Sequence, residues 1–182
     1  MKVSRGVKGQ IKKEVANAST EDQIKAFESS MKDFTEKMVN RGLPPKDAAG
    51  ISNKLLEGIY AQAYRLYNTG KYIEATHLFR LLILLDPNES KYVLGLAACF
   101  HMMKEYKNAI QTYTMCLMLD PQNPIPFYHS SDCYIQMKDF TSAILCLEMA
   151  IQQAGEKQEF AKLKERALLS LESLKKQEEA QP

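Results

Sequence analysis

The stretch KYIEATHLF at residues 71–79 decides the fold, because its pattern recurs as EYKNAIQTY at residues 105–113 and as DFTSAILCL at residues 139–147. The copies start at equal intervals, and each keeps an aromatic residue, an alanine three positions later and a bulky residue four positions after that. Two further columns keep the same interval: Leu66, Phe100 and Tyr134, and Ile59, Val93 and Phe127. Five columns that recur three times predict an internal structural repeat.

This interval, with a small residue between bulky ones, is typical of the tetratricopeptide repeat, a helix–turn–helix unit of about 34 residues. Alanine lets paired helices approach closely, and Pro87 and Pro121, one interval apart, end the second helix of a unit. Gly70 marks the turn inside the first unit, and Lys104 and Lys138 hold its place later. We therefore predict an all-α tetratricopeptide-repeat solenoid. Its three helix–turn–helix repeats occupy residues 56–155, with pairs at 56–89, 90–123 and 124–154.

Two segments precede the repeats. Residues 1–18 carry five lysines and arginines within the first 13 positions, which favours a disordered basic arm, or an arm that meets an acidic surface. Residues 19–55 predict a helix from Ser19 or Thr20 to about residues 40–42, followed by a linker at 43–47 that contains two prolines. The helix has an apolar stripe that could form a homodimer interface or fold back onto the first repeat: Ile24, Phe27, Met31, Phe34 and Met38.

Residues 156–182 predict a closing helix with a tail. The helix runs from about Glu156 to Glu178, and its apolar stripe would cover the open end of the solenoid: Phe160, Leu163, Ala167, Leu171 and Leu174. Further upstream, the run of five apolar residues at 81–85 is apolar on nearly every face of its helix. That run predicts a helix sandwiched between neighbours.

Composition narrows the classes of partner. The 182 residues have a formal net charge of +2, so the overall charge gives no reason to expect nucleic acid or a membrane surface as a partner. No run approaches the roughly 18–20 apolar residues of a membrane span, and the N-terminus lacks the apolar core of a signal peptide, so we expect a cytosolic protein. The four cysteines show no C-x-x-C pairing, and we interpret them as small core residues: Cys99, Cys116, Cys133 and Cys146.

Nothing in the sequence predicts an enzyme. His77, His101 and His129 lie in separate repeats without metal-ligand spacing. There is also no glycine-rich phosphate loop and no H-E-x-x-H helix. We expect no catalytic residues, no cofactor and no metal.

A binding surface is expected on the concave face, which the first helix of each pair lines in stacked helical repeats. The positions on that face that the repeat columns leave free form our predicted peptide-binding set: Tyr60, Tyr64, Tyr67, Leu94, Ala98, His101, Tyr128, His129, Asp132 and Ile135. Tyrosines among small residues suit an extended, partly apolar peptide. The set contains no lysine or arginine, so we do not expect a clamp for a C-terminal carboxylate. Alternatively, the tyrosines contact each other or the N-terminal helix.

Several stretches resemble one known family. The segment IYAQAYRLYNTGKY at residues 59–72 is similar to the opening repeat of class II type III secretion chaperones, the SycD/LcrH family. Residues 95–98 and 126–129, with Cys133, resemble its second and third repeats. The resemblance implies a homodimeric bacterial chaperone that acts in the cytoplasm without a cofactor. It would hold hydrophobic translocator proteins soluble by binding an extended segment in its groove, chiefly through Tyr60, Tyr64 and Tyr67.

Two other functions stay open at this point. A general tetratricopeptide adaptor or assembly factor would share the fold, but such an adaptor would be expected to carry a basic clamp on its concave face, which the predicted set lacks. A regulatory role linked to secretion, in which the chaperone without its client binds a transcription factor, would also share the fold.

Overall fold

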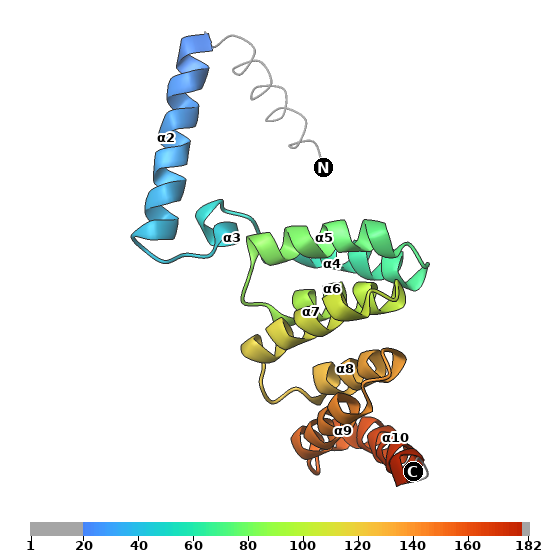
Figure 1. Ribbon diagram of the computed structural model, residues 1–182. Coiled ribbons are helices and arrows are strands. Elements are labelled where there is room, and N and C mark those ends of the chain that lie inside the picture. The colour runs from blue at the N-terminus through green and yellow to red at the C-terminus, as the bar shows by residue number, and fades with distance from the viewer. Residues whose placement is uncertain (1–19, 180–182) are drawn as a thin grey trace, which may run out of the picture. The chain divides into compact units, whose positions relative to one another are not determined.

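A computed structural model describes residues 20–179, and Figure 1 shows its helices in order. They are α2 (Thr20–Val39), α3 (Pro45–Ala48), α4 (Asn53–Asn68), α5 (Tyr72–Leu85), α6 (Ser90–Met102), α7 (Tyr106–Leu119), α8 (Pro124–Gln136), α9 (Phe140–Ala154) and α10 (Ala161–Glu179). A short 3₁₀ turn, η1 (Gln158–Phe160), precedes α10. The described residues contain no strand, so the all-α prediction is confirmed. The predicted basic arm at residues 1–18 lies outside the described residues.

The chain divides into two compact units, residues 1–51 and 52–182. In the second unit, α4 pairs with α5, α6 with α7 and α8 with α9, and the pairs stack in chain order (Figure 1). Ala75, Ala109 and Ala143 are fully buried, as expected for the small residue where two helices meet. Helix α10 packs against α9 and closes that end of the stack.

Two core clusters hold the later repeats together. One joins the second and third repeats and consists of Ala97, Ala109, Tyr113 and Cys133. The other, here called the closing cluster, joins α9 to α10 and consists of Ala143, Leu147, Ala167 and Leu174. The closing cluster contains two residues of the predicted stripe on the last helix, so that stripe does cover the end of the repeats.

The turn inside each repeat has the same backbone form. Gly70, Lys104 and Lys138 occupy equivalent positions in the three repeats, and their φ angles are 78°, 62° and 62°. In each case the next residue donates its N–H back five positions, for example Lys71 to Leu66 O at 2.9 Å and Glu105 to Phe100 O at 2.9 Å. These bonds satisfy carbonyls at the helix end, as in a Schellman motif. The left-handed conformation favours glycine, so the two lysines adopt it at a cost.

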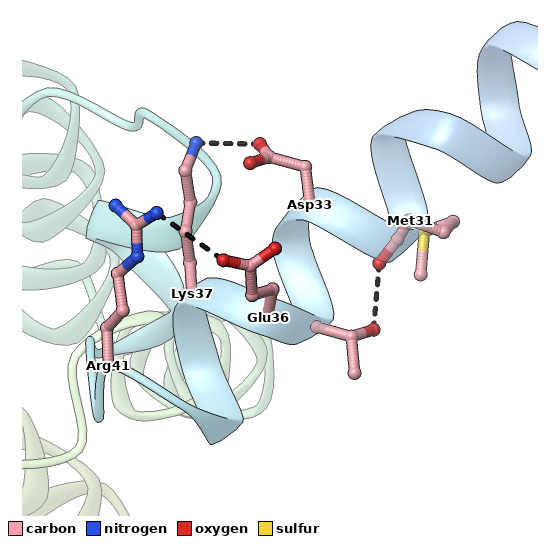
Figure 2. Close-up of polar contacts among 6 residues, drawn as sticks. Met31, Asp33, Glu36, Lys37 and Arg41 are labelled. Atoms are coloured by element: carbon pink, nitrogen blue, oxygen red, sulfur yellow. Dashed lines mark hydrogen bonds and ion pairs between the residues drawn. The ribbon is translucent and has the colours of Figure 1, made fainter.

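In the first unit, α2 has no buried residue within the described part of the chain. Its polar surface carries local contacts (Figure 2): Lys37 Nζ lies 2.7 Å from Asp33 Oδ2, and Arg41 lies 3.4 Å from Glu36. The Thr35 hydroxyl donates to the Met31 carbonyl at 2.8 Å. Pairs spaced three to five residues apart are typical of a helix exposed to water, and each adds little stability.

Three details of the sequence prediction are wrong. The expected linker at 43–47 overlaps helix α3, because Pro45 occupies the first helical position, where a missing N–H costs nothing. The last helix begins at Ala161 rather than Glu156, after the 3₁₀ turn. The apolar run at 81–85 is not enclosed: Leu82 is buried, but Leu81 and Leu84 are exposed on the outer side of α5. A second helix of a stacked pair buries only the sides that face its neighbours.

Candidate functional site

The first helices of the repeats form one pocket, here called the tyrosine pocket. It has a volume of about 200 Å³. Its lining comes mainly from α4, α6 and α8, with two residues from the second helices α5 and α7: Tyr60, Tyr64, Tyr67, Phe79, Lys91, Leu94, Gly95, Ala98, Tyr113, Ile125 and His129. All three repeats therefore contribute, and the pocket lies where the sequence predicted a peptide-binding surface.

The three tyrosines of α4 form a ladder along one wall of the pocket. Their spacing of four and three residues places them on one side of the helix. The ring centroids of Tyr60 and Tyr64 lie 6.4 Å apart, those of Tyr64 and Tyr67 lie 6.5 Å apart, and both pairs are stacked. The alternative that these tyrosines contact each other is thus correct, but it does not remove them from the pocket. Tyr64 is 53% exposed and offers its ring to a ligand.

The floor of the pocket depends on a close approach between Gly95 and Phe79. A Cβ at position 95 would lie 2.3 Å from Cε1 of the Phe79 ring, so only glycine leaves room for that ring. Phe79 is buried and meets the Tyr60 ring edge-on, with centroids 6.2 Å apart. Tyr113 is also buried, and it holds the same position in its repeat as Phe79 does. Both rings belong to the core and also line the pocket.

A lysine stands at the edge of the pocket. Lys91 Nζ donates a hydrogen bond to Glu57 Oε1 at 2.7 Å. It also lies 5.1 Å from the ring centroid of Tyr60 and 5.4 Å from that of Tyr92, within cation–π range. The hydrogen bond to Glu57 raises the pKa of Lys91, so the side chain stays protonated. Lys91 is not in the predicted peptide-binding set, so the pocket lining carries a lysine that the sequence prediction left out.

Two histidines meet near the third repeat. The rings of His101 and His129 lie 6.0 Å apart, and the His129 ring stacks on Tyr113 at 5.9 Å. Tyr113 Oη lies 3.5 Å from His101 Nδ1, and His129 Nδ1 lies 3.7 Å from Asp132 Oδ2. Burial lowers the pKa of His101, and the neighbouring His129 lowers it further. The lowered pKa favours the neutral imidazole of His101, which can exchange a hydrogen bond with the Tyr113 hydroxyl.

The structure brings part of the predicted set together. Six of the ten predicted residues line the tyrosine pocket: Tyr60, Tyr64, Tyr67, Leu94, Ala98 and His129. His101 and Asp132 lie beside it through their contacts with His129. Tyr128 and Ile135 pack against the closing cluster, and the Tyr128 ring also meets the His129 ring edge-on, with centroids 5.4 Å apart.

Sequence reasoning missed five lining residues: Phe79, Lys91, Gly95, Tyr113 and Ile125. A signal existed for two of them, since Lys91 and Ile125 are one repeat interval apart and share a column with Glu57. The other three depend on how the second helices and Gly95 pack, which the column pattern does not show.

The predicted dimer residues lie on α2. Ile24, Phe27 and Met31 are exposed, and Phe34 and Met38 are partly buried. Exposed apolar side chains that recur along one helix are a common feature of interaction surfaces.

The four cysteines are free, and burial raises the pKa of Cys99 and Cys133 to about 12, so these thiols are not reactive thiolates. No group of three or more His, Cys, Asp or Glu in residues 20–179 is placed to hold a metal. None of the described helices is long and apolar enough to cross a membrane.

Comparison with known proteins gives matches in this region. The tetratricopeptide repeat model matches residues 56–89 and 90–123. The chaperone protein SicA of Salmonella typhimurium is 38% identical over 71 residues, which are 39% of this chain and 43% of SicA. The chain thus matches less than half the length of this curated relative.

Solved structures match over a longer span. SycD, a type III secretion translocator chaperone of Yersinia enterocolitica described as an alternative dimer, has a TM-score of 0.69 and 33% identity. The alignment covers 71% of this chain and 98% of SycD. SycD in complex with a peptide of the translocator YopD has a TM-score of 0.68 and 33% identity over 70% of this chain and 98% of that one. Together with the repeat match, these structures confirm the tetratricopeptide fold.

Proposed function

This chain belongs to the family of type III secretion translocator chaperones that includes SycD, and we propose that it binds hydrophobic translocator proteins and keeps them soluble until export. The client would be held through an extended segment seated in the tyrosine pocket. Binding alone performs this task, without a cofactor or a catalytic step. We place the complex in the bacterial cytoplasm, where such clients are made.

One observation carries the proposal. The tyrosine pocket lies on the first helices of the repeats, and SycD, which shares the fold at 33% identity, binds a peptide of the translocator YopD. A translocator needs apolar segments for its later work in a membrane, and these aggregate in water when exposed. A preformed apolar pocket that covers one such segment lowers the exposed area. The ordered tyrosine ladder also reduces the entropy lost on binding.

The lining suits an extended chain. Each tyrosine gives a large flat contact surface and a hydroxyl that can bond to peptide backbone groups. An extended peptide leaves its own N–H and C=O groups unpaired, so a pocket with hydroxyls and an imidazole is a better match than a purely apolar one. We propose that the six predicted residues in the pocket contact the client directly, and that His101 and Asp132 hold His129 in place.

We also propose that the protein is a homodimer formed through α2. Ile24, Phe27 and Met31 expose a large apolar surface on that helix, and SycD is described as a dimer. Replacing Phe27 and Phe34 with Glu would bury charge in such an interface, so light scattering should show the mass of a monomer. An unchanged mass would exclude this interface.

The test of function is a co-expression pull-down with the proteins encoded beside this gene, using wild type and the Tyr60/Tyr64/Tyr67→Ala triple variant. We expect wild type to recover a neighbour with long apolar segments and the triple variant to lose it while keeping its helical circular dichroism. A matched control replaces three exposed apolar residues outside the pocket with Ala: Leu84, Met118 and Leu145. Equal recovery by wild type and the triple variant would contradict the proposal.

A further inference from the structure

The lining of the tyrosine pocket includes a cationic side chain, that of Lys91. Among the described residues that line the pocket, Lys91 is the one with a permanent charge. It shares a repeat column with Glu57 and Ile125, since the three lie at successive repeat intervals. Lys91 and Ile125 both line the pocket, so this column faces the space that a client would fill.

The Lys91 ammonium is held, but only loosely. It donates to Glu57 Oε1 at 2.7 Å and lies over the rings of Tyr60 and Tyr92. The side chains of Lys91 and Glu57 are 35% and 59% exposed. An ion pair this open to water contributes little and exchanges its partner readily. The cation–π contacts keep the ammonium in place whichever carboxylate binds it.

A client in the pocket would change the hydration of the Lys91 ammonium. A peptide laid on the tyrosine ladder removes water from the ammonium, and a dehydrated cation is costly unless an anion replaces the water. An ammonium has three donors, and the hydrogen bond to Glu57 uses one of them. The other lining residues offer rings, hydroxyls and an imidazole. Two ammonium donors are therefore left for the client, and a side-chain carboxylate is the acceptor that satisfies them most strongly.

We propose that Lys91 determines specificity in the tyrosine pocket, and that the client segment carries an aspartate or glutamate beside its apolar anchor, whose side-chain carboxylate binds the Lys91 ammonium. This inference rests on the proposed function. It adds that the client is recognised by one acidic position as well as by apolar area. Glu57 either shares the cation with the client carboxylate or turns into solvent.

The test selects peptides from a randomised 12-residue library displayed on phage, with each peptide fused through its C-terminus so that only side chains supply carboxylates. The full-length wild type should enrich peptides with an acidic residue at a fixed distance from an apolar anchor. Lys91→Met should keep the anchor and lose the acidic position, and Lys91→Glu should select lysine or arginine there. In a selected synthetic peptide with an amidated C-terminus, replacing the acid with its amide should weaken wild-type binding about tenfold. The same replacement should leave Lys91→Met binding unchanged.

Lys175→Met is the matched control, because Lys175 forms a similarly exposed ion pair with Glu148 at 2.9 Å on the closing helix. It should select the same peptides as wild type. If wild type enriches apolar peptides without an acidic position, the proposed role of Lys91 is overturned. The same holds if Lys91→Met selects the same acidic position as wild type. Both results leave the proposed function standing. If wild type enriches no apolar peptide, both proposals fall.

Discussion

The first two repeats and the third repeat use the same sequence positions in different ways. The column that holds Tyr60 and Leu94 in the first two repeats holds Tyr128 in the third. Tyr60 and Leu94 line the tyrosine pocket, whereas Tyr128 packs against the closing cluster. Ile135, in the column of Tyr67, also packs there.

The difference shows that the repeat position determines on which side of its helix a residue lies. The neighbouring helix then determines whether that side lines the pocket or is packed into the core. In the first two repeats this face lines the tyrosine pocket, to which the third repeat adds Ile125 and His129. At the end of the stack, α10 supplies Ala167 and Leu174 to a cluster that takes up the equivalent side chains of α8. A solenoid needs such an end cap, and the cap removes part of the last repeat from the binding surface.

The largest expected effect tests the capped end. Leu147 is fully buried in the closing cluster, so Leu147→Ala should lower the free energy of unfolding in urea by about 2–5 kcal/mol. Leu145, two residues away on α9, is 61% exposed and gives the matched control Leu145→Ala, with an expected change within about 0.5 kcal/mol. Equal losses for the two variants would mean that the cluster does not close the stack.

A second test concerns the pocket floor. Gly95→Ala places a Cβ against the Phe79 ring, so the ring must move toward the pocket. The free energy of unfolding should fall by about 1–3 kcal/mol, and the client should bind more weakly.

The control for that test is Gly58→Ala. A Cβ at Gly58 on α4 would meet open space among the described residues. Because alanine favours helix, this variant should gain about 0.5–1 kcal/mol. Adding Phe79→Leu to Gly95→Ala should recover part of the lost stability, because a leucine side chain can vacate the space. If Gly95→Ala is as stable as wild type, the close approach of Gly95 and Phe79 is not real.

The turns give a smaller effect that again separates the first repeat from the others. Gly70 suits its left-handed backbone, whereas Lys104 and Lys138 hold the same conformation with a side chain. Lys104→Gly and Lys138→Gly should each raise the free energy of unfolding by roughly 0.5–1 kcal/mol. Lys107→Gly lies inside α7 and should instead cost about 1 kcal/mol. Thermal unfolding of the three variants checks the sign.

The smallest effect lies at the junction between the second and third repeats. Burial and His129 lower the pKa of His101, so below its ordinary value of 6.5 the unfolded chain takes up a proton that the folded chain does not. Stability should therefore fall as the pH drops below about 6.5 and level off below the folded pKa. His101→Gln should reduce this dependence in unfolding curves measured between pH 7.5 and pH 5. An unchanged pH dependence would exclude His101 as its source.

Much of the fold follows from the repeat columns. Ala75, Ala109 and Ala143 predict where helices meet, because only a small residue fits a close crossing. The columns do not show packing between different positions, so Gly95 against Phe79 escaped prediction. They also hide differences within a column, because the column that holds Lys91 in the second repeat has a glutamate in the first repeat and an isoleucine in the third. Consecutive apolar residues are distributed around all sides of a helix, but a stacked helix buries only the sides that face its neighbours. Leu81 and Leu84 lie on the remaining sides and are exposed.

We propose that the tyrosine pocket binds the client and that the closing cluster supports the fold. Anisotropy of a fluorescently labelled client segment, taken from the protein recovered in the pull-down, tests it with Tyr64→Ala and Tyr128→Ala under conditions where both are folded. Tyr64→Ala should weaken binding by about 1–3 kcal/mol at unchanged helicity, because Tyr64 is exposed in the pocket. Tyr128→Ala should mainly reduce stability, and because its ring also meets the His129 ring at 5.4 Å, it should weaken binding less than Tyr64→Ala does. Wild-type affinity for Tyr64→Ala together with weakened binding for Tyr128→Ala would contradict the account.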